Sequence, residues 1–209
     1  MKVFLLIACF VFLAGCKICT CKQITCTAFD DALFNTWAPY QKDELLVFKN
    51  DAGVADTIRI VTVRKSEAFQ GTTGGGYGCG KGCFADASIY GTNMSGEDYE
   101  KFSFTASKSD PNGSASATLN FVGLRMNRVI FQGKSLTDTG FTPTDYSPKH
   151  ISKFSSSLTL SSKQFTNVQM IMADTSVVKL AGVYKVYLQK GKGLVAWESY
   201  PQKTLWVRE

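Results

Sequence analysis

Apolar and polar residues alternate in several stretches of this chain, and this alternation sets narrow limits on its fold. Phe102, Phe104 and Ala106 alternate with polar residues, and a second run alternates in the same way over residues 115–121. Between the two runs lies Asp110-Pro111-Asn112-Gly113, which consists of residues that favour turns. Because side chains in a strand point alternately to opposite faces, the two runs predict an antiparallel hairpin with one buried face.

Similar short runs continue along most of the chain. We expect further strands over residues 45–48, 57–64, 84–90, 128–132, 157–160, 168–172, 183–189, 194–200 and 204–207. Turn signals separate them at intervals of about 8–12 residues, which is typical of a sandwich or barrel. Ile60 and Val61 break the alternation of their strand, which indicates a bulge or burial on both faces. Residues 138–156 are rich in Thr, Ser and Pro, so we expect a long loop there.

A short helix is expected before the first strand, where large apolar residues follow a near-helical spacing: Phe29, Leu33, Phe34 and Trp37. Pro39 would end this helix. The sequence therefore predicts a mainly β fold, in which an antiparallel meander forms a sandwich or an open (half) barrel, with one short N-terminal helix. Residues 29–209 are expected to form a single β-rich domain.

The N-terminal residues have the pattern of an export signal. Lys2 precedes an uncharged apolar run over residues 3–14, and Leu13-Ala14-Gly15-Cys16 closes that run. The run is shorter than the ~20 residues that a transmembrane helix needs, whereas it fits a secretory signal with a small-residue cleavage site. The alternatives are an ordinary secreted protein and a short membrane anchor.

The order Leu13-Ala14-Gly15-Cys16 resembles the lipobox of bacterial lipoproteins. This resemblance implies cleavage before Cys16, a diacylglycerol on its sulfur and an acylated amine. Residues 1–15 would then be a lipoprotein signal peptide, and residues 16–28 a polar tether between lipid and domain. Several acyl chains on one residue give a lasting anchor, so the implied partner of Cys16 is the lipid bilayer.

Both ends of the expected domain are similar to small lipoproteins of Bacteroidota. An aromatic strand, a Lys/Gly turn, a hydrophobic strand and a terminal Thr-Trp follow one another over residues 187–206. Trp37-Ala38-Pro39-Tyr40 and residues 47–53 are similar to the openings of these proteins. The family is largely uncharacterised, so the resemblance implies a place in the cell envelope and no catalytic residue. No acidic cluster follows Cys16, which favours the periplasmic side of the outer membrane.

The chain contains seven cysteines, and five of them follow Cys16. Outside the cytoplasm cysteines favour disulfides, and the glycines between Cys79 and Cys83 permit a turn that could join them. The odd count leaves at least one thiol free or paired between chains. The close spacing of four cysteines is similar to that of a thiolate metal site: Cys16, Cys19, Cys21 and Cys26. Lipidation would remove Cys16 from such a cluster, so we expect no metal there.

The segment Gly71–Cys83 is the most unusual part of the sequence. Gly75 and Gly80-Lys81 have the spacing of a phosphate-binding loop, but position 82 is Gly where that motif needs Ser or Thr for magnesium. A strand is predicted after it, whereas a phosphate loop leads into a helix. We therefore expect a flexible loop, with a ligand-contacting flap around Tyr77 and Lys81 as the alternative.

Few residues offer catalytic chemistry. His150 is the only histidine, no Gly-x-Ser-x-Gly sequence occurs, and the histidine falls in the expected polar loop. Carboxylates could hydrolyse glycosides without histidine, and those available are Asp30, Asp31, Asp43, Glu44, Asp86, Glu97 and Asp98. Adjacent residues on a strand point to opposite faces, so these neighbours are no evidence of a working pair. We predict no catalytic residue and no cofactor.

Composition and charge narrow the function further. The formal net charge is +6, but the basic residues are scattered and form no basic stripe with interleaved aromatics, so no nucleic-acid partner is expected. We expect a non-enzymatic binding or structural module of the envelope, whose partner is an envelope protein or an apolar ligand. The alternatives are a periplasmic carrier of an apolar ligand, which needs a wide apolar groove, and a carboxylate-based periplasmic hydrolase. A filled core would favour the binding module.

Overall fold

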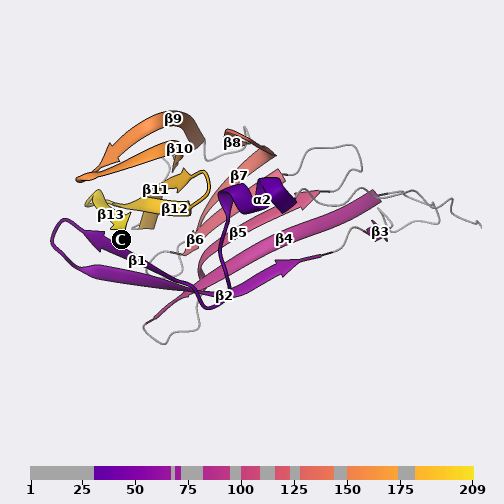
Figure 1. Ribbon diagram of the computed structural model, residues 1–209, viewed down its shortest axis with the longest axis horizontal. Coiled ribbons are helices and arrows are strands. Elements are labelled where there is room, and N and C mark those ends of the chain that lie inside the picture. The colour runs from indigo at the N-terminus through magenta and orange to yellow at the C-terminus, as the bar shows by residue number, and fades with distance from the viewer. Residues whose placement is uncertain are drawn as a thin grey trace, which may run out of the picture.

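The described residues form one curled antiparallel sheet and one short helix. The computed structural model describes residues 31–66, 69–71, 82–94, 100–108, 116–122, 128–143, 150–173 and 182–209. Figure 1 shows the sheet curling into a half-barrel with the helix against it. The predicted mainly β fold, its antiparallel half-barrel form and its short N-terminal helix are confirmed.

Helix α2 spans Asp31–Trp37 and precedes the strands. The first half of the sheet contains β1 (Leu45–Asn50), β2 (Ala55–Lys65), β3 (Phe69–Gly71), β4 (Gly82–Asn93), β5 (Glu100–Lys108), β6 (Ser116–Val122), β7 (Arg128–Thr137) and β8 (Gly140–Pro143). The second half contains β9 (His150–Leu160), β10 (Lys163–Ala173), β11 (Gly182–Gln189), β12 (Gly193–Tyr200) and β13 (Thr204–Arg208).

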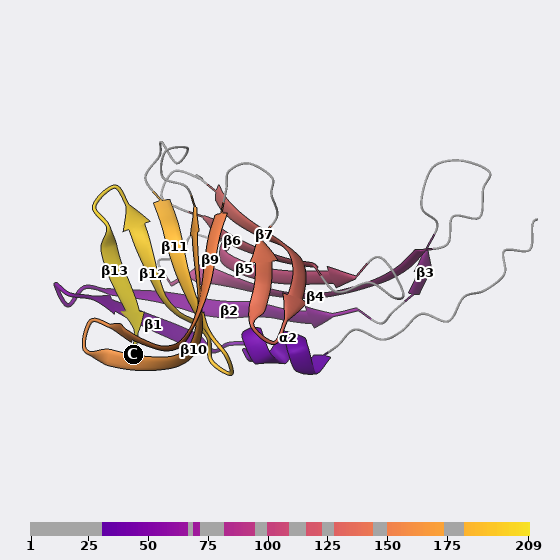
Figure 2. The same ribbon diagram turned by 90° about the horizontal axis from the view of Figure 1, so that it is seen from above.

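The strands follow a simple antiparallel path. Its order is β8-β7-β6-β5-β4-β2-β1-β13-β12-β11-β10-β9, with β3 paired to β4 at the side. Strand β1 pairs with both β2 and β13, so the first and last strands lie side by side (Figure 2). The two ends of the path come close together, because Gly140 of β8 packs on Gln169 of β10, the strand next to β9. A Cβ atom on Gly140 would lie 1.9 Å from the Gln169 side-chain oxygen.

Apolar side chains fill the interior of the curl. Phe34 and Trp37 of α2 are fully buried and share one core with residues of both halves of the sheet. The Phe34 ring centroid lies 5.6 Å from that of Phe104 in β5. The indole nitrogen of Trp37 donates a 2.9 Å hydrogen bond to the carbonyl of Thr137 in β7. The helix therefore closes the interior space that the curled sheet leaves.

A second apolar cluster lies on the opposite face of β10–β13. Val186 and Trp197 belong to the interior core, whereas their neighbours Tyr187 and Ala196 belong to the second cluster, as alternating side-chain direction requires. Its buried members are Leu160, Phe165, Val168, Tyr187, Val195, Ala196 and Val207. We call this the outer cluster. This half of the sheet is thus apolar on both faces.

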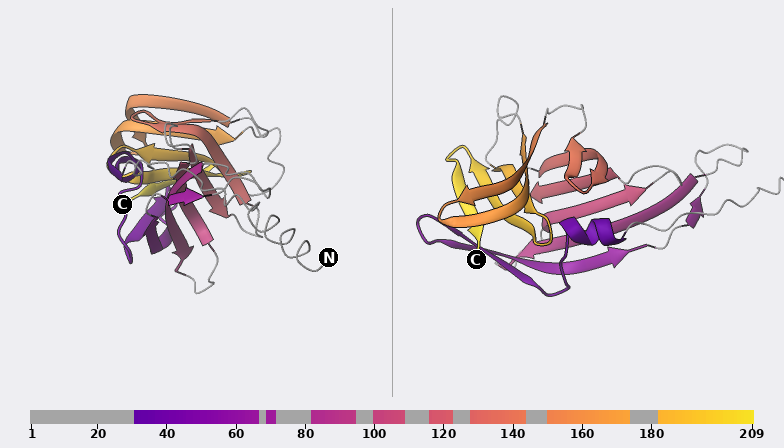
Figure 3. Two further views of the ribbon diagram at one scale, coloured as in Figure 1. Left: turned by 90° about the vertical axis from the view of Figure 1, so that its right-hand side faces the viewer. Right: turned by 45° about the horizontal axis from the view of Figure 1, so that its top comes forward.

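The β9–β10 hairpin bends across the outer cluster. Its pairing skips Asn167, which has a left-handed φ of 52°, and resumes at Val168. The tip of the hairpin then reaches distant parts of the chain. Ser161 Oγ bonds with Asp51 Oδ1 at 3.2 Å, and Lys163 Nζ donates to the Arg208 carbonyl at 2.9 Å. Figure 3 shows the tip turned toward β1 and the C-terminus.

Two local predictions have clear outcomes. The bulge expected at Ile60 and Val61 is confirmed, because the register between β2 and β4 shifts between Ile60 and Thr62. The long loop expected over residues 138–156 is wrong, because β8 and the first part of β9 lie within it. Strand β9 ends the path of the sheet and most of its side chains are exposed or half-buried. Its sequence therefore lacks the apolar alternation of a covered strand.

Candidate functional site

Most of the predicted site residues lie outside the described residues. This holds for the lipidation site Cys16, for the other tether cysteines, and for Tyr77, Cys79 and Lys81. Cys83 lies in β4, where its backbone pairs with Gln70, but its side chain is outside the description. The predicted disulfide between Cys79 and Cys83 and the flap around Tyr77 and Lys81 therefore stay predictions.

The candidate catalytic residues that the structure describes lie in strands or take part in ion pairs and hydrogen bonds. His150 opens β9 instead of lying in a loop, and burial lowers the pKa of its imidazole. Asp43 pairs with Arg59, and Glu44 pairs with Arg208 at 2.7 Å. Asp86 accepts a hydrogen bond from Ser66 at 2.7 Å. The described carboxylates of this set are thus held by neighbouring side chains.

A groove separates the bent hairpin tip from the end of the sheet below it. It has a volume of about 640 Å³ and is lined by Pro39, Glu44, Lys163, Gln164, Phe165, Gly191, Lys192, Val195, Arg208 and Glu209. We call it the hairpin groove. Phe165 and Val195, both members of the outer cluster, are among its lining residues, although only 6% and 1% of their surfaces are exposed. The groove exists because β10 bends at Asn167, just beyond the point where its pairing with β11 stops.

The charges around the hairpin groove are mostly neutralised by one another. Arg208 pairs with Glu44 and also donates a 2.9 Å hydrogen bond to the carbonyl of Lys192. Lys49 and Lys163 both pair with Glu209, at 2.8 and 3.3 Å. Their hydrogen bonds hold the pKa of the Glu209 carboxyl below its ordinary value.

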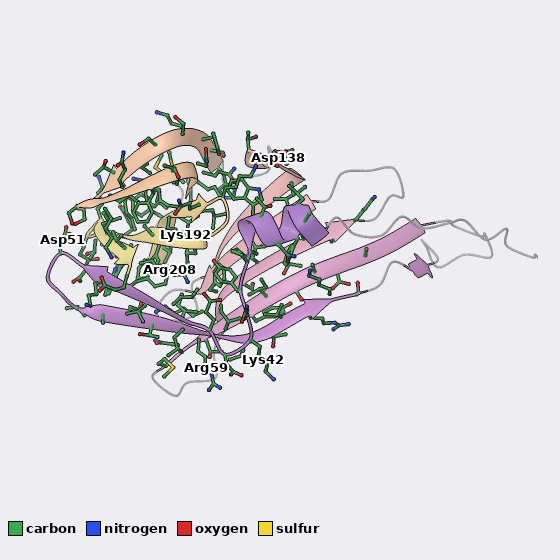
Figure 4. The ribbon with its side chains drawn as sticks, in the orientation of Figure 1. Lys42, Asp51, Arg59, Asp138, Lys192 and Arg208 are labelled. Atoms are coloured by element: carbon green, nitrogen blue, oxygen red, sulfur yellow. The ribbon has the colours of Figure 1, made fainter. Side chains whose placement is uncertain are left out.

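Lys192 is the exception among the charged side chains of the groove. It is exposed, and within the described residues no carboxylate pairs with its ammonium group. Its backbone is nevertheless fixed, because Arg208 bonds to its carbonyl and Gly191 bonds to the Thr36 carbonyl at 2.7 Å. Figure 4 shows Lys192 and Arg208 close together beside β12 and β13. The groove therefore offers one uncompensated positive charge on a rigid turn.

A compact polar cluster lies further along β11 and β12. The Glu198 carboxylate accepts hydrogen bonds from Tyr184 and Tyr187 and pairs with Lys185 at 2.7 Å. Burial raises the pKa of the Glu198 carboxyl, but these hydrogen bonds outweigh it and the pKa is lowered overall. Burial and the hydrogen bonds to Glu198 raise the pKa of both tyrosines. The carboxylate is saturated by its neighbours, so the cluster stabilises the sheet and exposes no reactive group.

A further, largely buried ion pair lies beside Trp197 of the interior core. Lys101 of β5 pairs with Asp56 of β2, and both side chains are largely buried. The ammonium group also lies 5.7 Å from the centroid of Trp197, which stacks on Trp206 at 4.9 Å. The cation is therefore balanced by both a carboxylate and an aromatic face, which fits a role in holding the two halves of the sheet together.

The described residues thus define a mainly β half-barrel with an apolar core on its inner face and an external groove. No protein-family model, curated protein or solved structure matches the chain. No described helix has the length and apolar character needed to cross a membrane. Within the described ranges, no three His, Cys, Asp or Glu side chains gather as metal ligands would.

The hairpin groove was not anticipated from the sequence. Its two sides come from residues 39–44, 163–165, 191–195 and 208–209, which only the folded sheet brings together. The sequence predicts a Lys/Gly turn over residues 190–193, and Gly191 and Gly193 adopt positive φ. Its sequence carries no sign that Lys192 would stand beside Phe165.

Proposed function

We propose that this chain is a lipid-anchored, non-enzymatic binding module of the bacterial cell envelope. The burial of Phe34 and Trp37 inside the curl carries the proposal, because among the described residues these side chains of α2 occupy space where a curved sheet of the carrier type would shelter an apolar ligand. Binding is therefore assigned to the outside of the sheet. The lipobox-like order Leu13-Ala14-Gly15-Cys16 supports anchoring at the membrane.

The ion pairs of the described groove carboxylates, together with the lowered pKa of Glu209, support a non-enzymatic role. A glycosidase needs two carboxyl groups that face one substrate bond, one of them with a raised pKa. Among the described acids, Glu44 and Glu209 line the hairpin groove, and both are paired with basic side chains. The pKa of Glu209 is lowered, which is opposite to the shift that a general acid requires.

The anchor is tested by expressing the full chain in a bacterial host and measuring the mass of its mature N-terminus. We expect an acylated Cys16 and membrane fractionation that Cys16→Ser abolishes. A matched Cys26→Ser variant should fractionate like the wild type. An intact leader, or unchanged fractionation of Cys16→Ser, would overturn anchoring.

The binding class is tested by native mass spectrometry of protein purified from its own envelope. We expect the polypeptide without a bound apolar small molecule, and no turnover of a panel of chromogenic glycosides. A stoichiometric acyl compound in the spectrum would instead establish the carrier function. Hydrolysis that survives purification would establish the hydrolase.

A further inference from the structure

The wall of the hairpin groove contains a strand edge that no described strand covers. Strand β10 pairs with β11 only over Val168–Met172, whereas it pairs with β9 down to Lys163. The segment Lys163–Thr166 therefore has a neighbour on its β9 side alone. The groove lies on its other side, because Lys163, Gln164 and Phe165 line it together with residues of β12 and β13.

The register identifies which backbone groups face the groove. Leu160 and Lys163 flank a two-residue turn, so they form the hydrogen-bonded pair that closes the hairpin. Hydrogen-bonded and non-hydrogen-bonded pairs alternate along an antiparallel ladder, so Phe165 bonds toward β9 while Gln164 and Thr166 do not. The N–H and C=O groups of Gln164 and Thr166 consequently point away from β9, to the side on which the groove lies. Gln164 lines the groove, and Thr166 lies next to its lining, where its hydroxyl oxygen accepts a 3.5 Å hydrogen bond from the Gln189 side chain.

We propose that the hairpin groove binds an extended peptide segment of another envelope protein, which adds to the edge of β10 as a further strand. The backbone groups of Gln164 and Thr166 would pair with the peptide, as in other recognition by strand addition. This inference deepens the proposed binding function and rests on it.

The side chains of the groove define the sequence of that peptide. Phe165 and Val195 line the groove but are only 6% and 1% exposed, so they offer a narrow apolar strip that suits small aliphatic side chains on one face of an extended peptide. Lys192 offers a positive charge that no described carboxylate balances, so an acidic side chain one or two positions away would complement it. The predicted ligand is an extended peptide with an acidic residue next to alternating apolar residues.

A lipid surface is the competing occupant, since anionic headgroups would also seek Lys192. The strand edge favours the peptide, because only a polypeptide supplies donors and acceptors at the spacing of Gln164 and Thr166. An acyl chain would leave those groups unpaired while removing water from them, which carries an energetic penalty.

The test uses the full mature chain with Cys16→Ser and a random dodecapeptide library displayed on phage. We expect selected peptides to combine an acidic residue with alternating apolar residues. Hydrogen exchange on this same Cys16→Ser chain should show that a selected peptide slows exchange of the Gln164 and Thr166 amides. This readout needs no substitution in the hairpin.

Two matched pairs of variants locate the binding site. Thr166→Pro removes an N–H that faces the groove, whereas Thr159→Pro removes one that faces the far edge of β9. Lys192→Glu reverses a charge in the groove, whereas Arg64→Glu makes the same reversal on β2. We expect Thr166→Pro and Lys192→Glu each to weaken binding about tenfold or more, and both controls to bind like the parent.

Three results would overturn the inference. They are a selection that enriches no peptide, enriched peptides that bind Thr166→Pro and Lys192→Glu as well as the parent, and phosphatidylglycerol vesicles that bind the parent in a Lys192-dependent way while peptides do not. Each leaves the proposed envelope function intact, because acylation of Cys16 and the absence of an apolar ligand are measured separately.

Discussion

The hydroxyl of Tyr40 occupies the space in which any side chain at position 193 would stand. It accepts a 2.5 Å hydrogen bond from the backbone N–H of Leu194, and a Cβ atom on Gly193 would lie 2.2 Å from it. Burial raises the pKa of Tyr40, so the phenol stays protonated. This contact ties the segment after α2 to the turn between β11 and β12, and thereby fixes one end of the hairpin groove.

Gly193→Ala is therefore expected to destabilise the protein strongly. Position 193 has a φ of 73° and no room for a Cβ, so we expect a loss of about 3 kcal/mol in urea denaturation. Gly191→Ala is the matched control, because Gly191 has a φ of 80° but no atom within 4 Å of its Cβ position. It should lose only about 1 kcal/mol. Equal losses for the two variants would refute the steric role of Tyr40.

Phe34→Ala tests whether α2 fills the interior. Phe34 is fully buried against Phe104, so removing its ring should lower the free energy of unfolding by about 3–5 kcal/mol. Asn35→Ala, at an exposed position of the same helix, should change stability by less than about 0.5 kcal/mol. If α2 were a dispensable appendage, denaturant unfolding of Phe34→Ala would match that of the control.

Glu198→Gln should change how stability depends on pH. The folded state lowers the pKa of this carboxyl below its ordinary 4.5, so its contribution is present above about pH 4.5 and is lost as pH falls through the folded pKa. The variant lacks this contribution, so its stability should fall less steeply in acid. At pH 7 it should be about 2 kcal/mol less stable, because Lys185 loses its partner.

Glu198→Gln should also change the titration of two tyrosines at high pH. Burial raises the pKa of Tyr184 and Tyr187, and their hydrogen bonds to Glu198 raise it further. Stability from these raised pKa values is present below pH 10 and is lost above it. In Glu198→Gln, ultraviolet titration should show tyrosinate forming at lower pH. Glu209→Gln provides a control that leaves both tyrosines unchanged. Identical tyrosine titrations in the wild type and Glu198→Gln would show that the hydrogen bonds to Glu198 do not raise the pKa of Tyr184 and Tyr187.

Asn167→Val tests the bend that creates the hairpin groove. Asn167 has a φ of 52°, which Asn tolerates and a β-branched residue does not, so we expect a loss of about 1–2 kcal/mol. Asn167→Gly should be nearly neutral. Exchange of the Lys190 amide, which bonds to the Asn167 carbonyl at 3.0 Å, should accelerate only in the valine variant. Equal exchange in both variants would mean that the bend does not depend on this residue.

Much of the sheet could be predicted from local patterns. Phe102, Phe104 and Ala106 are fully buried, and Phe104 pairs with Leu119, as the alternation of both runs requires. Pro39 follows the helix that it was expected to end. These features depend on neighbours in sequence, so a short window contains the information. The sequence predicts only residues 157–160 of β9 as a strand, because the exposed first part of this edge strand needs no apolar alternation.

The candidate site could not be predicted in the same way. Phe165 and Val195 meet because β10 bends at Asn167, and Lys192 stands beside Arg208 because β12 and β13 pair. The groove also needs Glu44 beside Arg208, and these two residues are 164 positions apart in sequence. The pairing of β1 with β13 brings their segments together. Asn at a left-handed position gives a weak local signal of a bend, but it does not show what the bent strand approaches.

The adjacency of β1 and β13 also sets when the domain can finish folding. Until Thr204–Arg208 has been synthesised, β1 and β12 each present a bare backbone edge, and such edges template aggregation. A nascent chain must therefore remain shielded until β13 has emerged, and a premature stop just before Thr204 would release an aggregation-prone fragment.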